Sequence, residues 1–281
     1  MFGLLCTDSL NIVGHSMFIN YRLALYNLFN KENFKEVRLS SDLEKITHLF
    51  IVDEHFRYNL EIWGDEQFIK ILNDKNIKVI IFNSEKIYID AFPWNVKIQN
   101  MVRVIKNHVQ FVCDIDEAKM FGTRVINKFF LSKSLIFNIP KEEKEEKILF
   151  IGQIEGDQYR KRKELLESIK NIGLEIDIYN SQRKLQYIDI LKLYNKYKYV
   201  LCPIGTGKWF SYRHYEVTRL GSIPIQQVTS DMIEWFYELQ DTSIFFQDQK
   251  DIEDKINNFK IANKEISLED YFKKIRLEEY L

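Results

Sequence analysis

Short apolar runs alternate with longer segments of helical character along the whole 281-residue chain, and this alternation limits the possible folds most strongly. Runs of about four to seven apolar residues predict buried strands, and the segments between them predict helices. The predicted strands are residues 1–7, 48–52, 78–82, 109–113, 148–151, 175–179, 199–203, 222–225 and 243–246. Strands that alternate with helices predict a parallel sheet with helices on both faces.

A charged segment divides the chain into two parts of similar length. Residues 141–147 read KEEKEEK and follow Pro140, a composition typical of a solvated linker or helix start. A chain of 281 residues that is 46% hydrophobic suits two domains better than one. We therefore predict two Rossmann-like α/β domains that face a cleft, at residues 1–140 and 148–281. A terminal helix over 265–281 packs either within the second domain or back on the first.

The segment 198–227 carries the strongest functional pattern. A predicted strand ends at Pro203, a loop contains Gly205 and Gly207, and a helix follows from an N-cap at Ser211 to a terminating Gly221. The unpaired N–H groups of a helix start carry partial positive charge, and glycine lets a ligand approach the backbone. This arrangement favours an anion.

Two charged residues of this helix point to a nucleotide. Arg213 offers a planar set of donors that suits phosphate oxygens. Glu216 follows three residues later on the same side of the helix, and a carboxylate there accepts hydrogen bonds from the hydroxyls of a ribose. The alternative is that the two side chains form only a surface ion pair.

The spacing of these residues resembles a known motif. The pattern S-x-R-x-x-E-x-x-x-x-G-x-I-P, which runs from Ser211 to Pro224, is similar to the nucleotide-sugar motif of GT-B glycosyltransferases, including exostosin-like and CgeB-like enzymes. Phage DNA β-glucosyltransferase carries a looser form. The resemblance implies a GT-B fold, with Arg213 on the donor diphosphate and Glu216 on the ribose.

A second basic group is expected to meet the same diphosphate. The strand 148–151 ends at Gly152, and the following helix begins with Arg160, Lys161 and Arg162. Cations are disfavoured in the first turn of a helix unless an anion compensates them. By resemblance this loop holds the donor in GT-B enzymes, so we predict roles for Gly152, Arg160 and Arg162. The alternative is a solvated helix flank.

Carboxylates at the ends of first-domain strands are candidates for the catalytic base. A carboxylate that takes the acceptor proton assists sugar transfer to a hydroxyl. Glu85, after the third predicted strand, is our first choice, and it loosely matches the position of the base in the phage enzyme. Asp53 and Glu54 are the next candidates. Each could instead cap a helix or pair with Arg57 or Lys86.

Other residues receive weaker assignments. Gly14 and His15 follow the first strand, where a glycine loop lets a sugar approach and His15 could contact a hydroxyl, although a loop histidine is often only exposed. Helical spacing directs His214 away from Glu216, which suggests a structural role. No H-x-x-x-H or cysteine-pair pattern predicts a metal site, and by resemblance GT-B enzymes hold the diphosphate with arginines and helix ends.

The composition limits location and partners. Net charge is −1, so no general basic field is expected to attract nucleic acid or membranes. Three scattered cysteines, no apolar stretch of bilayer length and no basic signal region fit a reducing cytoplasm. We predict a transferase that needs no cofactor and uses a nucleoside-diphosphate sugar, most simply a UDP-sugar. Its acceptor is expected to be a surface glycan; the alternatives are a hydroxymethylated base in phage DNA and a non-catalytic nucleotide-sugar binder.

Overall fold

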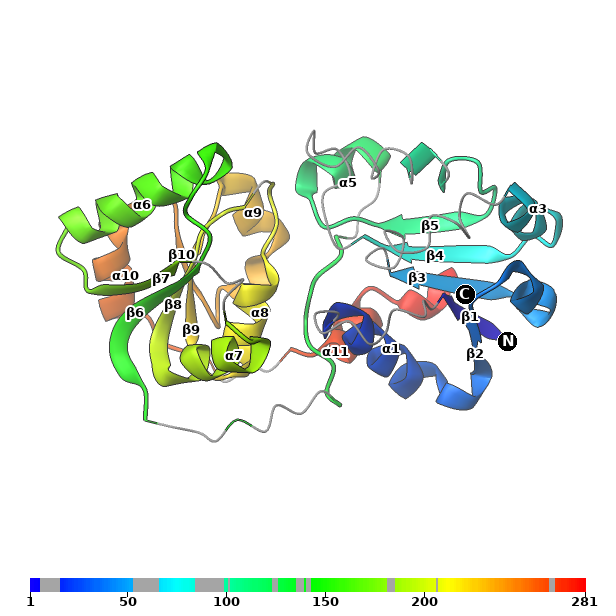
Figure 1. Ribbon diagram of the computed structural model, residues 1–281, viewed down its shortest axis with the longest axis horizontal. Helices are drawn as coiled ribbons and strands as arrows, with labels where there is room; N and C mark the ends of the chain where they lie inside the picture. The colour runs from blue at the N-terminus through cyan, green and yellow to red at the C-terminus, as the bar shows by residue number, and fades with distance from the viewer. Residues whose placement is uncertain are drawn as a thin grey trace. The chain divides into compact units, whose positions relative to one another are not determined.

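The computed structural model describes residues 1–5, 16–52, 66–83, 99–100, 102–122, 126–134, 139, 143–180, 185–205, 207–262 and 266–281. Contacts divide the chain into two compact units (Figure 1). Unit 1 comprises Met1–Ile136 with Ile266–Leu281, and unit 2 comprises Phe137–Glu265. Each unit is described by itself below.

Unit 1 is built on a five-stranded parallel sheet with the strand order β2-β1-β3-β4-β5. Its elements are β1 (Phe2–Leu5), α1 (Ser16–Phe29), β2 (Phe34–Val37), β3 (His48–Val52), α3 (Glu66–Asp74), β4 (Lys78–Phe82), β5 (His108–Phe111), α5 (Ile115–Phe121) and α11 (Leu268–Lys274), with short 3-10 turns at Lys31–Asn33, Ser40–Lys45 and Leu277–Tyr280. The strands predicted at 48–52 and 78–82 have the bounds of β3 and β4.

The two faces of this sheet are covered differently. One face is aliphatic and packs Leu49, Ile51 and Val79 against Phe68 and Leu72 of α3. The opposite face is aromatic. There, Phe82 of β4 contacts Tyr21 of α1 and Phe272 of α11, with ring centroids 5.0 and 5.3 Å apart. Both faces are therefore buried, which explains why the central strands read as continuous apolar runs.

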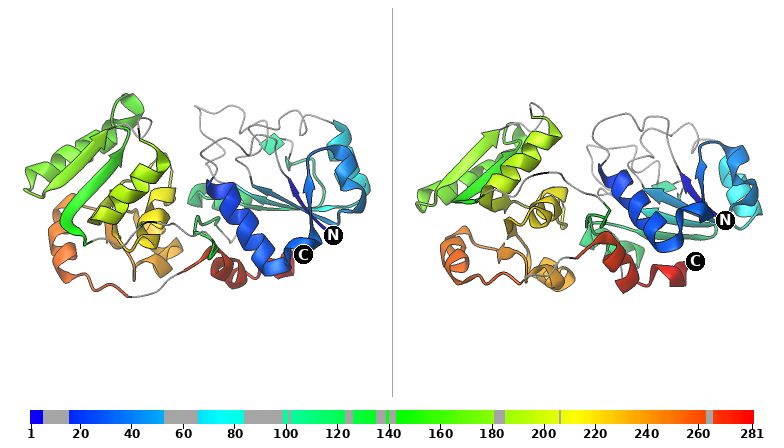
Figure 2. Two further views of the ribbon diagram at one scale, coloured as in Figure 1. Left: turned by 60° about the horizontal axis from the view of Figure 1, so that its bottom comes forward. Right: turned by 90° about the horizontal axis from the view of Figure 1, so that it is seen from below.

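The chain end belongs to unit 1. Helix α11 lies against α1, as both views in Figure 2 show. Glu269 of α11 accepts hydrogen bonds from Ser132 Oγ at 2.5 Å and from the Lys133 amide at 2.9 Å. A terminal helix is present within 265–281 but is shorter than predicted, because α11 ends at Lys274 and a 3-10 turn follows Arg276, which lies at φ 51°.

Strand β2 was not predicted from the sequence. Its residues read FKEV, and only the last of them is fully buried, so the apolar signal of a central strand is missing. The segment forms a strand because it pairs in parallel with the whole length of β1, from Phe2↔Phe34 to Leu5↔Val37. It lies at the edge of the sheet, where partial exposure is normal.

Unit 2 has a second five-stranded parallel sheet, with the order β10-β9-β8-β6-β7. Its elements are β6 (Glu145–Gly152), α6 (Arg160–Asn171), β7 (Ile176–Asn180), α7 (Tyr187–Lys196), β8 (Tyr197–Cys202), α8 (Tyr212–Arg219), β9 (Ile223–Gln227), α9 (Ser230–Trp235), β10 (Ile244–Phe246) and α10 (Ile252–Asn258), with short 3-10 turns at Asp157–Tyr159, Tyr237–Leu239 and Gln249–Asp251.

Helices cover both faces of this sheet as well. Leu165 and Leu166 of α6 and Ile252 of α10 pack on one face with Phe150 and Leu201. Ile190, Leu191 and Tyr194 of α7 and Val217 of α8 pack on the other with Leu149, Ile151 and Val200. The prediction of two Rossmann-like α/β units with parallel sheets is confirmed.

Both sheets share one connectivity. Numbered within its own unit, each has its first strand between its second and third strands, followed by the fourth and fifth. In such doubly wound sheets the chain reverses direction between the first and third strands, and ligands bind beyond the carboxyl ends of those strands. The expected position is therefore β6 and β8 in unit 2, and β1 and β3 in unit 1.

Candidate functional site

The carboxyl ends of β6 and β8 bring the predicted donor residues of unit 2 together. Gly152 is the last residue of β6, and Gly205 lies in the loop that leads from β8 to α8. The position of an added Cβ on Gly152 would be 2.9 Å from Cζ of Phe150 and 3.0 Å from Nη2 of Arg213. Arg213 thus reaches across the strand end from α8, and glycine is needed where it does so.

Helix α8 is short, and its two ends differ. Ser211 occupies the N-cap position, as predicted, in an extended conformation, but its side chain caps no amide and its buried Oγ has no hydrogen-bond partner among the described residues. At the other end Gly221 lies at φ 70°, with the Ser222 amide bonded to the Val217 carbonyl at 3.1 Å. This is a Schellman closure, which requires the left-handed conformation that glycine adopts without strain.

Arg213 is almost fully buried, with 9% of its surface exposed. Its Nε donates to Tyr194 Oη at 3.3 Å, and its guanidinium lies over the Phe150 ring at 5.4 Å from the centroid. No carboxylate forms a salt bridge with Arg213 in the described parts of the chain. A buried cation held by a phenol and a ring retains donors for an anionic ligand.

Arg162 lies beside Arg213. Its guanidinium is 5.9 Å from the centroid of the same Phe150 ring and 4.9 Å from that of Tyr159, and its Nη1 donates to the Gln153 carbonyl at 2.8 Å. Its Nε is buried and has no partner among the described residues. Burial and the nearby Arg213 charge lower the pKa of Arg162 to about 10. Two like charges are held together here, and an anion would relieve their repulsion.

Glu216 shares helix α8 with Arg213 and is also buried, with 7% of its surface exposed. Its Oε1 accepts a hydrogen bond from Tyr187 Oη at 2.7 Å. Burial raises the pKa of Glu216, while the hydrogen bond from Tyr187 and the Arg213 charge oppose that rise. The predicted alternative of a surface ion pair does not describe these two residues, since both are buried and no salt bridge joins them in the described chain.

Arg160 is placed apart from this cluster. Its side chain is 78% exposed, and its Nε lies 3.6 Å from Glu164 Oε1 on the same helix. The structure thus brings Gly152, Arg162, Arg213 and Glu216 together, and leaves Arg160 on the solvated flank of α6. The five first-domain candidates lie outside the described residues: Gly14, His15, Asp53, Glu54 and Glu85.

Three supporting residues escaped sequence reasoning. Phe150 lies beneath both guanidinium groups, and Tyr187 and Tyr194 each contact one charged residue of α8. The tyrosines are seven residues apart on α7, a spacing of about two turns that places them on one face. The sequence could have indicated their shared role only through this spacing, but tyrosines on one face of a helix usually belong to the core.

His214 is held from both ring nitrogens behind the cluster. It is fully buried, with Nδ1 at 3.1 Å from Gln226 Oε1 and Nε2 at 3.1 Å from Ser243 Oγ. Burial lowers its pKa to about 3, so the ring is neutral at physiological pH. These bonds tie α8 to β9 and to the start of β10, which fixes the rotation of the helix that carries Arg213.

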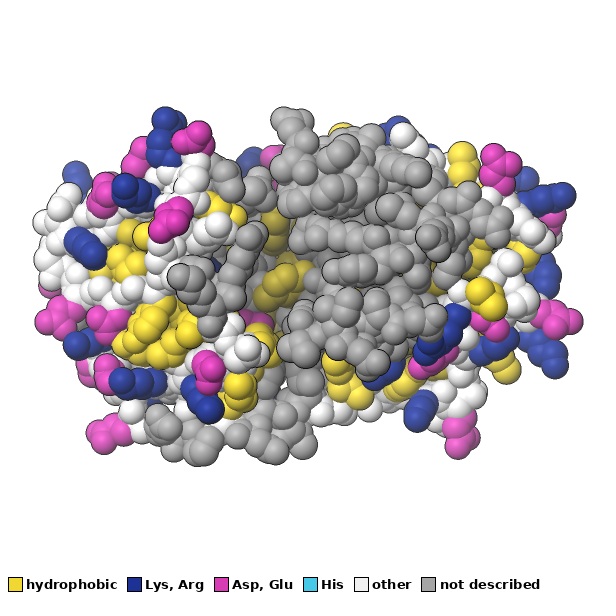
Figure 3. Space-filling model, viewed as in Figure 1, with side chains coloured by type: hydrophobic (Ala, Val, Ile, Leu, Met, Phe, Trp, Pro, Cys, Tyr) yellow, Lys and Arg dark blue, Asp and Glu magenta, His cyan; other side chains and the backbone are white. Residues whose placement is uncertain are grey.

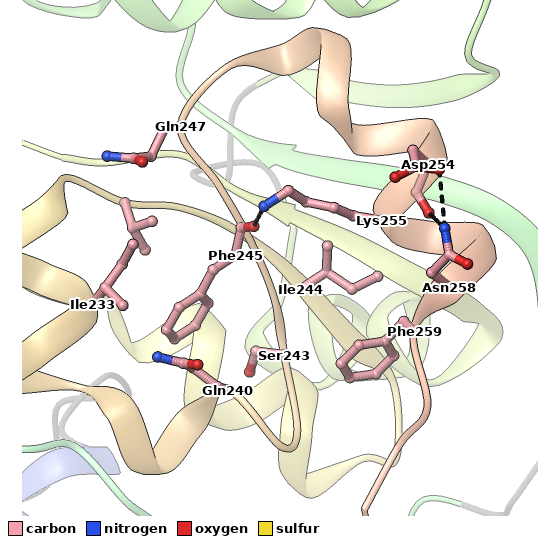
Figure 4. Close-up of a pocket in the computed structure, with 11 residues that line it drawn as sticks. Ile233, Gln240, Ser243, Ile244, Phe245, Gln247, Asp254, Lys255, Asn258 and Phe259 are labelled. Atoms are coloured by element: carbon pink, nitrogen blue, oxygen red, sulfur yellow. Dashed lines mark hydrogen bonds between the residues drawn. The ribbon is translucent and has the colours of Figure 1, made fainter.

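A cavity of about 390 Å³ lies at the other edge of this sheet, along β10 (Figure 4). No predicted site residue lines it. Two of its polar side chains are held by neighbouring groups: Asn258 Nδ2 donates to the Asp254 side chain at 2.9 Å, and Lys255 Nζ donates to the Phe245 carbonyl at 2.9 Å. Because the predicted donor residues meet elsewhere, we place the candidate site at β6 and β8.

Within the described residues, no cluster of His, Cys, Asp and Glu has the arrangement to hold a metal ion. None of the helices in those same segments combines the length and apolar character needed to cross a bilayer.

Comparison with known proteins gives remote structural similarities. No family model and no curated protein matches the chain. Among solved structures, the chain is similar to an alpha1,3-fucosyltransferase, with a TM-score of 0.44 and 10% identity over 99% of this chain and 78% of that one. It is also similar to the spinosyn forosaminyltransferase SpnP, with a TM-score of 0.42 and 7% identity over 100% of this chain and 95% of that one. At these scores neither similarity carries an argument about function, which rests on the geometry of unit 2.

Proposed function

We propose that this protein is a glycosyltransferase of the GT-B plan, which moves a sugar from a nucleoside-diphosphate sugar to an acceptor hydroxyl. The donor binds to unit 2 at the carboxyl ends of β6 and β8. Its diphosphate lies against Arg162 and Arg213, and its ribose lies against Glu216. The simplest co-substrate is a UDP-sugar.

The single observation that carries this proposal is the pair of adjacent guanidinium groups on the Phe150 ring. Arg213 is buried and Arg162 is half-buried, and neither has a carboxylate partner in the described chain. Two adjacent cations in this setting cost free energy unless a ligand supplies negative charge. A diphosphate supplies two charged groups a few ångströms apart. The spacing of one helical turn between Arg213 and Glu216 then sets a hydroxyl-binding carboxylate beside the phosphate-binding group.

The chain's residues have separate tasks in the transfer. The bond between the sugar C1 and the diphosphate oxygen breaks, and a bond forms between C1 and the acceptor oxygen. The nucleoside diphosphate leaves with an added negative charge, which Arg162 and Arg213 stabilise. A carboxylate takes the acceptor proton as the bond forms. Glu85 is the proposed base, with Asp53 and Glu54 as alternatives, on sequence position alone.

For the acceptor we favour a glycan over DNA. A DNA acceptor would call for a broad basic surface, because each phosphate contact adds affinity. Net charge is −1, and the face in Figure 3 shows Lys and Arg interspersed with Asp and Glu. A reducing cytoplasmic location is supported by Cys202, which is a buried free thiol.

Calorimetric titration with a panel of nucleoside-diphosphate sugars tests the donor site. We expect Arg213→Ala and Arg162→Ala each to weaken binding between about tenfold and 150-fold, the range for a lost hydrogen bond to a charged group. Lys163→Ala is the matched control, because it removes one charge from an exposed position on α6, where Lys163 Nζ lies 3.9 Å from Glu167 Oε1. Equal losses in all three variants, or no binding by the native protein, would refute the site.

Product analysis separates an enzyme from a non-catalytic binder. An enzyme releases free nucleoside diphosphate from the bound donor, by transfer or by slow hydrolysis, whereas a binder does not. We expect Glu85→Ala to abolish this release and leave donor affinity within about twofold. Retained turnover in that variant would move the base to Asp53 or Glu54.

A further inference from the structure

The Glu216 carboxylate is held at one oxygen only. Tyr187 Oη donates to Oε1 at 2.7 Å, and no hydrogen bond reaches Oε2 from the described residues. Tyr187 is the first residue of α7, while Glu216 lies in the middle of α8, so the bond joins two neighbouring helices. The carboxylate is therefore fixed in rotation and keeps acceptor capacity.

The number of acceptor positions decides what such a carboxylate can bind. A carboxylate has about four lone-pair positions, and one phenol occupies one of them. Two adjacent hydroxyls of a ligand need both oxygens at once and in a fixed orientation. A carboxylate that rotated freely would lose part of this affinity in becoming ordered on binding.

We propose that Tyr187 is a positioning residue that orients Glu216 for the vicinal diol of a ribose, and that it thereby sets a preference for ribonucleotides over 2′-deoxyribonucleotides. The inference rests on the proposed donor site. The spacing of Arg213 and Glu216 by itself predicts neither the role of Tyr187 nor the preference for ribonucleotides.

The charged and titratable groups around Glu216 agree with this role. Arg213 is on the same helix, Tyr187 and Tyr194 are on α7, and Cys202 ends β8. Among these groups only Tyr187 donates a hydrogen bond to Glu216. Its hydroxyl thus both orients the carboxylate and favours the ionised form that accepts bonds from a diol.

Calorimetry with UDP, GDP and their 2′-deoxy forms tests the proposal in three proteins. The native protein is expected to bind at least one ribonucleotide at least tenfold more tightly than its deoxy form. In Tyr187→Phe, affinity for that ribonucleotide should fall five- to tenfold, while affinity for the deoxy form changes less than twofold. Tyr197→Phe is the matched control, because it removes a similar tyrosine–carboxylate bond, to Asp177 Oδ2 at 2.6 Å, outside the site. It should leave both affinities unchanged.

The possible results distinguish a failure of the Tyr187 proposal from a failure of the donor site. Equal weakening of both nucleotide forms by Tyr187→Phe would mean a general structural role and overturn the proposal. Unchanged affinity for both forms, or a native protein without ribose preference, would also overturn it, while the donor site at Arg162 and Arg213 would stand. Failure of the native protein to bind any of the four nucleotides would refute the donor site itself.

Discussion

The buried histidine of α8 makes unit 2 sensitive to mild acid, by an amount that the structure defines. In the folded protein the His214 ring is neutral, with both nitrogens hydrogen-bonded and a pKa lowered by burial from 6.5 to about 3. The unfolded chain binds a proton at this site below about pH 6.5, and the folded chain does not. Stability is therefore complete above pH 6.5 and is lost as pH falls toward 3.

The size of the effect follows from the pKa difference. Each unit of pKa is worth about 1.4 kcal/mol, so the full loss approaches about 5 kcal/mol near pH 3. At pH 5 the unfolded histidine is almost fully protonated, and the loss is about 2 kcal/mol. This is large for a small α/β unit, because domains are stable by only about 5 to 15 kcal/mol.

Urea unfolding of the native protein and of His214→Gln, at pH 7.5 and pH 5, isolates the contribution of His214 to the pH dependence of stability. Glutamine carries a donor and an acceptor but does not titrate, and the other histidines occur in both proteins and cancel. The variant should be less stable at pH 7.5, because Gln226 or Ser243 loses a partner, yet its decline toward pH 5 should be smaller by about 2 kcal/mol. Equal declines in the two proteins would refute a neutral, buried His214.

Three further changes test other parts of the fold and the site. Gly152→Ala should weaken nucleotide binding about tenfold, because the new methyl group would lie 2.9 Å from Phe150 Cζ and 3.0 Å from Arg213 Nη2 and displaces both side chains; unchanged affinity would contradict this geometry. Gly221→Ala should cost about 1 kcal/mol of unfolding free energy, since φ is 70° and no atom lies within 4 Å of the added carbon, and Gly205→Ala, at a glycine without positive φ, is the control. Glu269→Ala should destabilise unit 1 by about 3 kcal/mol in urea unfolding at pH 7, because three neighbouring groups lose their acceptor. Burial raises the pKa of Glu269, but the hydrogen bonds that it accepts lower it by more, so the pKa lies below its ordinary value of 4.5. The contribution of Glu269 to stability should therefore be present above pH 4.5 and fade as pH falls below it. A stability that does not change over this pH range would argue against these hydrogen bonds.

The sequence predicted the strand–helix alternation well because the central strands are buried on both faces. Such strands must be continuously apolar, and runs such as KVIIF and HLFIV are visible without any knowledge of their neighbours. The edge strand β2 was missed for the complementary reason. Its FKEV sequence becomes a strand only through pairing with β1, and pairing leaves no periodic signal in a single segment.

The sequence also determined which charged residues share α8, whereas tertiary packing decided which others join them. Helical geometry alone places Arg213 and Glu216 one turn apart. The choice between Arg160 and Arg162 depended on how α6 rotates against β6, and that rotation follows from the burial of its leucines.

The partners of the site depend on contacts that are remote in sequence. Tyr194 lies 19 residues from Arg213, and Tyr187 lies 29 residues from Glu216. They meet because α7 and α8 pack on one face of the same sheet. Local periodicity fixes the position of a side chain around its own helix, while the environment that gives it a charge state and a ligand arises only when separate elements pack together.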